Sequence, residues 1–130
     1  MRSGERPVLM RGFSLIELIV VVAIIAVLLV IALPRYEASL DRARDVALQT
    51  SLKTMRESID RFREDKDRYP QSLQELVDQH YLRSVPVDPV TGLATTWQLE
   101  EAQAQHSSGI AGVRSGAEGA AQDGRLYSDL

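Results

Sequence analysis

The chain contains no cysteine among its 130 residues. A disulfide framework and a thiolate metal site are therefore both excluded, and cysteine usage does not indicate a redox compartment. The two histidines, His80 and His106, lack the spacing of metal ligands, and no nucleophile-elbow, phosphate-loop or dinucleotide-binding motif occurs. The net charge of −3 does not indicate a nucleic-acid-binding surface. We therefore expect no enzymatic activity, no required cofactor and no nucleic-acid partner.

Charge is almost missing from one long segment. From Phe13 to Leu33 the chain runs for 21 residues with a single ionisable side chain, Glu17. A helix of this length spans roughly 30 Å, which matches the hydrocarbon core of a bilayer. The sequence therefore predicts a membrane-spanning helix over residues 13–33, followed by one small domain over residues 34–130.

The charges on the two sides of this segment are unequal. Three arginines precede it with one acid among them, whereas the two arginines that follow it closely are offset by acids: Arg2, Arg6 and Arg11 against Glu5, then Arg35 and Arg42 against Glu37 and Asp41. An excess of arginine and lysine stays on the cytoplasmic side. This bias predicts a cytoplasmic N-terminus and a C-terminal domain on the opposite side of the membrane.

Two simpler interpretations compete with an assembly helix. A secretory signal peptide with a cleavage site after Ala32 is one, but its apolar region is usually roughly 7 to 15 residues long and carries no acid. A plain membrane anchor is the other, and there Glu17 would cost about 2.5 kcal/mol or more deep in lipid. Glu17 lies near the first turn, where the helix dipole favours a carboxylate. A cation on another chain would be the natural partner of Glu17.

The string RGFSLIE at residues 11–17, followed by the apolar run, resembles the cleavage and methylation signature of type IV pilins and type II secretion pseudopilins. The resemblance implies that a prepilin peptidase removes residues 1–12 by cutting between Gly12 and Phe13, and then N-methylates Phe13. A glycine presents no Cβ to an approaching protease. The new amine is cationic and stays so when methylated, so Phe13 of one subunit would neutralise Glu17 of its neighbour.

A second apolar pattern follows the membrane segment. Pro34 predicts a kink, a local break or the end of the helix. The resemblance to pilins, which have a proline at this place, implies that Pro34 acts in assembly together with Phe13 and Glu17. Beyond it an apolar stripe recurs every 3.7 residues on average, close to the helical period: Tyr36, Leu40, Ala43, Ala47/Leu48, Leu52, Met55, Ile59 and Phe62. A coiled coil is the alternative, but its heptads fail at Asp41 and Asp45. The resemblance implies one continuous helix of about 50 residues, ending near Lys66.

The C-terminal half predicts short elements. Tyr69-Pro70 ends the long helix, and the capping box from Ser72 to Glu75 opens a short helix that reaches about His80. Residues 85–92 are expected to form an irregular loop, and the strand candidates are residues 95–99, 110–113 and 126–127. The predicted fold class is α+β: a long N-terminal helix whose first half spans the membrane and whose second half packs on a short helix and a small antiparallel sheet.

Several features of this half resemble the major, G-type pseudopilin of type II secretion systems. They are Tyr69-Pro70 with the helix after it, the Pro86-x-Asp88-Pro89 motif, and a glycine-rich end with Asp123-Gly124. This implies a homo-oligomeric helical filament in the periplasm, anchored in the inner membrane and assembled with minor pseudopilins and an inner-membrane platform. A pilus subunit for adhesion, motility or DNA uptake, and a membrane-anchored periplasmic binding module that never polymerises, remain alternatives.

The same resemblance implies a calcium ion in the C-terminal loop, where carboxylates and carbonyls would be suitable ligands. Residues 109–124 offer only Glu118 and Asp123, with Asp129 beyond them. Gly112 and Arg114 stand where more acidic or polar residues would be expected. A calcium site and a plain flexible loop are both open interpretations.

Overall fold

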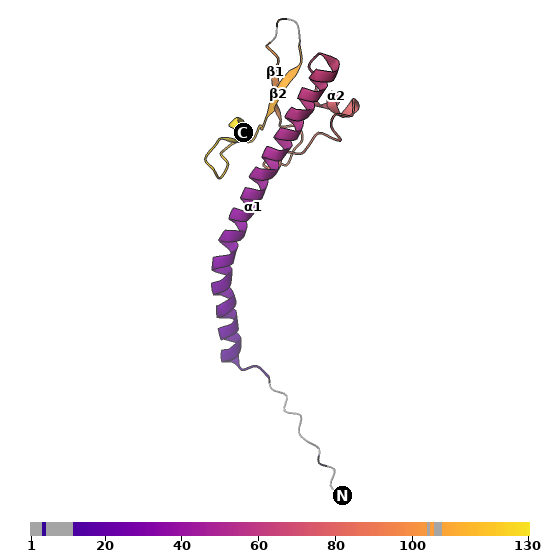
Figure 1. Cartoon of the computed structure of the whole chain (residues 1–130). Helices are drawn as coiled ribbons and strands as arrows, with labels where there is room; N and C mark the ends of the chain where they lie inside the picture. Colours follow the sequence, from indigo (N-terminus) through magenta and orange to yellow (C-terminus); the bar gives the residue numbers. More distant parts are fainter. Residues whose placement is uncertain (1–3, 5–11, 104, 106–107) are drawn as a thin grey trace. The chain divides into compact units, whose positions relative to one another are not determined.

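The computed structural model describes residue 4, residues 12–103, residue 105 and residues 108–130 (Figure 1). Its elements are helix α1 (Leu15–Lys66), helix α2 (Leu73–Asp78), strands β1 (Gln98–Glu101) and β2 (Ile110–Arg114), and the 3-10 helix η1 (Tyr127–Asp129). This order confirms the predicted α+β class. The chain divides into two compact units, residues 1–37 and 38–130. The leader arginines Arg2, Arg6 and Arg11, and also His106, lie outside the described residues.

Helix α1 confirms the prediction of one long helix. It comprises 52 residues and includes Pro34, so the proline does not end the helix. In the first unit the side chains from Phe13 to Leu33 are all exposed, and this part of α1 is long and apolar enough to cross a membrane. Because the protein's own core covers none of these side chains, they are free to contact lipid or other helices.

The second half of α1 forms one side of the core of residues 38–130. Five of its apolar side chains are no more than 1% exposed: Leu48, Leu52, Met55, Ile59 and Phe62. They pack with Leu73 and Leu76 of α2 and with Ile110 and Val113 of β2. The predicted stripe was too long at its start, since Tyr36 is 67% and Leu40 39% exposed. The first buried residue of the helix is Asp45, which interrupts the heptads.

Helices α1 and α2 are joined at a tight corner. Helix α1 ends where Asp67 adopts a left-handed backbone with a φ of 53°, and α2 begins after Ser72, whose side chain accepts a hydrogen bond from the Glu75 backbone. The predicted cap is therefore confirmed. Helix α2 ends two residues earlier than expected, because His80 is also left-handed, at a φ of 65°, and cannot continue the helix.

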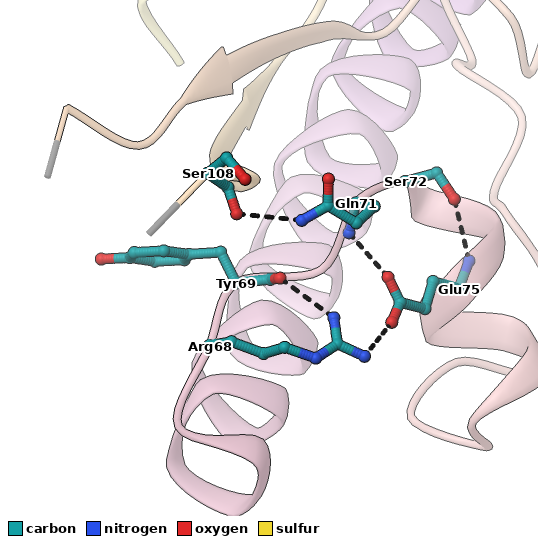
Figure 2. Close-up of polar contacts among 6 residues, drawn as sticks. All are labelled: Arg68, Tyr69, Gln71, Ser72, Glu75 and Ser108. Carbon is teal, nitrogen blue, oxygen red and sulfur yellow. Dashed lines mark hydrogen bonds and ion pairs between the residues drawn. The ribbon is translucent and has the colours of Figure 1, made fainter. Parts of the chain in front are cut away.

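Polar contacts hold this corner in place (Figure 2). The Glu75 carboxylate accepts one hydrogen bond from the Arg68 guanidinium and another, at 2.7 Å, from the Gln71 backbone N–H. The Gln71 side chain then donates to the Ser108 carbonyl at 2.9 Å. The corner is thereby attached to the segment that leads into β2.

Strands β1 and β2 form a two-stranded antiparallel sheet, with Gln98 opposite Arg114 and an irregularity between Glu100 and Glu101. The first strand begins three residues later than predicted. Trp97 is buried instead, and its indole N–H donates to the Pro86 carbonyl at 2.8 Å. The third predicted strand is wrong: Leu126 forms one isolated bridge with Ala120, and Tyr127 begins η1.

Candidate functional site

The residues of the predicted cleavage site lie directly before helix α1. Gly12, Phe13 and Ser14 are outside the helix, and Leu15 is its first residue. The Ser14 hydroxyl oxygen accepts a hydrogen bond from the Glu17 backbone N–H at 3.2 Å. The Ser14 carbonyl accepts another from the Leu18 N–H at 3.1 Å. Ser14 is therefore the N-cap of the helix, and it satisfies an N–H that would otherwise lack a partner.

This cap was missed in the sequence, although the signal was present. Ser14 and Glu17 have the spacing of a capping box, the same pattern that identified the start of α2 at Ser72. The cap places the bond between Gly12 and Phe13 just outside the helix. Backbone at that position has no helical hydrogen bonds to break before a protease can bind it.

Both residues of the predicted cleavage bond are accessible. Gly12 is exposed and Phe13 is 83% exposed. A Cβ added to Gly12 would have no atom within 4 Å, and Gly12 has no positive φ. Nothing in the described part of the chain therefore requires glycine at position 12. The fold therefore does not explain this glycine, and the predicted cleavage after Gly12 stays a prediction.

Glu17 lies in the first turn of α1, where the helix dipole favours its negative charge. Within residues 12–103, 105 and 108–130, no ion pair to Glu17 is formed. The pairing of Glu17 with Phe13 of a second chain stays a prediction. Further along the helix, Val20, Ala23, Ile24, Val27 and Leu28 line a shallow apolar groove. A small residue such as Ala23 allows another helix to approach closely.

The structure does not combine the predicted calcium ligands into one site. Glu118 and Asp129 are exposed. Asp123 is engaged by Arg125, whose backbone N–H and Nε donate to the two carboxylate oxygens at 3.0 and 2.8 Å. The hydrogen bond from the Arg125 side chain lowers the pKa of Asp123. In the portion of the chain that the structure describes, no three Asp, Glu or His side chains are placed to hold a metal. Glu118, Asp123 and Asp129 therefore do not form a cluster of carboxylate ligands, and calcium binding stays an untested prediction.

Asp88 has a structural role that the sequence did not reveal. It is 0% exposed, and one carboxylate oxygen accepts from the backbone N–H groups of Val90 and Thr91 at 2.8 and 3.3 Å. The other accepts from the Ser115 hydroxyl at 2.6 Å. The Pro86-x-Asp88-Pro89 motif thus closes its own loop and attaches it to the end of β2. The turn-forming spacing of Asp88 was visible in the sequence, but its partner Ser115 was not.

Comparison with known families agrees with the geometry at the start of α1. The profile of the family described as "Prokaryotic N-terminal methylation motif" matches residues 10–33. This range contains the predicted cleavage bond, the cap and the whole apolar segment. No solved structure matches the chain.

Three curated relatives are similar to this chain in sequence beyond residues 10–33. The type IV major pilin protein PilA of Myxococcus xanthus is 39% identical over 66 residues, which cover 51% of this chain but only 30% of that protein. The competence protein ComGC of Halalkalibacterium halodurans is 31% identical over 71 residues, covering 55% of this chain and 70% of that protein. The type II secretion system core protein G of Pseudomonas aeruginosa is 30% identical over 94 residues, covering 60% and 66%. The chain belongs to the type IV pilin-like family, which includes the pseudopilins.

Proposed function

We propose that the chain is a structural subunit of a type II secretion pseudopilus, which polymerises through its N-terminal helix and drives protein export across the outer membrane. One observation carries the proposal. The exposed Gly12–Phe13 bond directly precedes a capped helix whose first turn holds Glu17 and whose next residues are apolar and exposed. This arrangement suits cleavage by a protease followed by packing of the new N-terminus against another helix.

Processing would change the electrostatics of the first turn. Cleavage after Gly12 releases a cationic amine at Phe13, and methylation keeps the charge. In a bilayer an isolated carboxylate is costly, so Glu17 gains most from a cation at its own depth on a neighbouring chain. Pro34, which lies inside α1, completes the proposed assembly residues.

The proposed topology follows from this chemistry and from the charge bias of the sequence. A prepilin peptidase removes residues 1–12, residues 13–33 anchor the subunit in the inner membrane, and residues 34–130 form the periplasmic domain. The arginines of the leader keep the N-terminus cytoplasmic until cleavage. Other copies of the chain, minor pseudopilins and an inner-membrane assembly platform are the proposed partners. The role is structural, so the energy for export would come from another component of the system.

The extent of the similarities favours a pseudopilus over a pilus. The match to core protein G covers 60% of the 130 residues of this chain, or about 78 residues, which is longer than residues 1–66, so it includes part of the domain beyond α1. The 66-residue match to PilA is short enough to be accommodated by the leader and α1 alone. The higher identity to PilA, together with ComGC, supports a second candidate: a pilus subunit for adhesion, motility or DNA uptake.

Assembly can be tested because the chain has no native cysteine. A single Val20→Cys substitution places one thiol in the apolar groove of α1. We expect oxidation of membranes to give disulfide-linked dimers, and Glu17→Ala to lower their yield by about tenfold or more. Glu57→Ala, a change to an exposed acid of the same helix, is the matched control and should leave the yield unchanged. A dimer yield that is equally low in the Val20→Cys, Glu17→Ala and Glu57→Ala chains would instead support a membrane-anchored module that does not polymerise, and an equally high yield would contradict the role of Glu17.

A gene deletion separates the two filament functions. Loss of secreted proteins from the medium, with motility, adhesion and DNA uptake unchanged, is the outcome expected of a pseudopilus. Normal secretion with loss of one of the other three activities would contradict the first proposal and support the pilus subunit.

A further inference from the structure

The segment from Ser115 to Leu130, here called the terminal segment, is attached to helix α1 by polar side chains. Asp45 of α1 is only 6% exposed. One of its carboxylate oxygens accepts from the Gln122 backbone N–H at 2.9 Å, and the other accepts from the Tyr127 hydroxyl at 3.1 Å. A single buried carboxylate therefore binds the terminal segment at two points. Burial, followed by the hydrogen bond to Asp45, raises the pKa of Tyr127, so the phenol stays a donor at neutral pH.

Two further contacts extend this attachment along the helix. The Gln122 side chain donates to the Ala38 carbonyl at 2.8 Å. The Arg56 guanidinium donates to the carbonyls of Val113 and Leu130 at 3.0 and 2.6 Å. Residues 38, 45 and 56 are separated by about two and three helical turns, so they share one face of α1. The terminal segment therefore follows this face over about five turns.

The attachment also satisfies the buried polar groups. No buried side-chain nitrogen or oxygen atom in the described ranges lacks a hydrogen-bond partner. Ala117, Ala121 and Leu130 of the terminal segment are themselves buried. Asp45 already accepts two hydrogen bonds and Asp123 is paired with Arg125, so an ion would have to displace these contacts in order to bind either carboxylate.

We propose that Asp45 is the clamp that closes the terminal segment onto helix α1, and that the closed state requires no divalent cation. Direct hydrogen bonds to Asp45 and Arg56 hold the segment in the place of a bound ion. The Asp45 carboxylate accepts from the segment, and the Arg56 guanidinium donates to it. A carboxylate with two donors and a guanidinium with two carbonyls are charge-assisted contacts, which are stronger than neutral ones. This inference does not depend on whether the filament is a pseudopilus or a pilus.

Trypsin cleavage after Arg125 reports opening of the segment, because Arg125 lies between Gln122 and Tyr127, the two residues bonded to Asp45, and its carbonyl is held in a turn by the Ala121 N–H. The full chain in detergent micelles is digested with either calcium chloride or EDTA present, and the products are followed by mass spectrometry. For the native sequence we expect equal cleavage rates under both conditions. Asp45→Ala should raise the rate roughly tenfold, since it removes two hydrogen bonds to a charged acceptor. Calcium should not reverse this increase.

Asp41→Ala is the matched control, because Asp41 is an exposed acid one turn earlier on the same helix. It should cleave at the native rate. If Asp45→Ala loses its helical circular dichroism, Tyr127→Phe replaces it; this variant loses one of the two bonds and should cleave about threefold faster. Faster cleavage of the native chain in EDTA, or an Asp45→Ala rate equal to that of Asp41→Ala, would overturn the proposal.

Discussion

Among the glycines of the chain, Gly116 has the least room for a side chain. A Cβ at this position would lie 2.0 Å from the Thr96 carbonyl oxygen, which belongs to backbone that cannot rotate away. At Gly112 an added Cβ would meet the Glu100 carboxylate at 2.6 Å, which is the far end of a flexible side chain. The fold therefore requires a glycine at position 116, whereas at position 112 a larger residue can be accommodated by movement of the Glu100 side chain.

Alanine substitutions test this difference. Gly116→Ala should lower the free energy of unfolding by about 2 kcal/mol, because the Thr96 backbone must shift to admit the methyl group. Gly112→Ala should change it by less than about 1 kcal/mol, since the Glu100 side chain can move. Chemical denaturation of the full chain in micelles measures both values. Equal losses for the two variants would contradict the geometry at Gly116.

Glu75 supplies a pH-dependent contribution to stability. The hydrogen bond from Arg68, and then the one from the Gln71 backbone, lower the pKa of Glu75 below the ordinary value of a glutamate side chain. A carboxyl group with a lowered pKa in the folded state stabilises the fold above its unfolded pKa, and this contribution is lost as the pH falls through the folded pKa. Because the ion pair is partly exposed, the effect should be modest and sensitive to salt.

Glu75→Gln removes this contribution without changing the size of the side chain. We expect the variant to melt at a lower temperature than the native chain at neutral pH, with a constant difference down to about pH 5. Below about pH 4 the difference should shrink as Glu75 becomes protonated. Thermal melts across this range provide the check, with Glu118→Gln, a change to an exposed acid, as the control. A difference that grows with acidification would show that the sign is wrong.

At the scale of elements, long-range contacts explain which predictions failed. Helix α1 was predictable because its apolar run and its stripe repeat locally. The short strands were not: Trp97 has high strand propensity, yet it is buried against the 86–93 loop through its bond to Pro86. Asp45 interrupts the heptad pattern of the apolar stripe of α1, so the sequence pattern did not place it among the buried residues. Its partners Gln122 and Tyr127 are 77 and 82 residues away, which no local pattern reveals.

The two halves of the apolar stripe should respond differently to truncation. Leu48 is 0% exposed, so Leu48→Ala leaves a cavity in the core and should lower the free energy of unfolding by about 2–5 kcal/mol. Leu40 lies on the same stripe but is 39% exposed, so Leu40→Ala should cost less than about 1 kcal/mol. Denaturant titration of the two variants compares them directly. A large loss at Leu40 would mean that this end of the stripe is covered after all.

At the scale of the whole molecule, the two compact units carry different parts of the function. Residues 1–37 contain the predicted cleavage bond, Glu17 and the exposed apolar part of α1; the apolar part was predictable from the sequence because its pattern is local, and the cleavage stays a prediction. Residues 38–130 contain the core and the terminal segment, whose closure depends on contacts distant in the sequence. The proposed filament subunit would use both units: residues of the first would pack against other copies in the membrane, and the second would be the folded domain that each copy adds to the filament.

We propose that the chain is processed between Gly12 and Phe13, so that it assembles through its new N-terminus. The most direct test is the intact mass and N-terminal sequence of the mature protein, purified from membranes of a cell that makes a prepilin peptidase. The account predicts a chain that begins at Phe13 and carries one additional methyl group, and a peptidase-deficient strain should accumulate the uncut form. A mature chain that begins at Leu33, as a signal peptide would leave, or one that keeps Met1 in the presence of the peptidase, would contradict it.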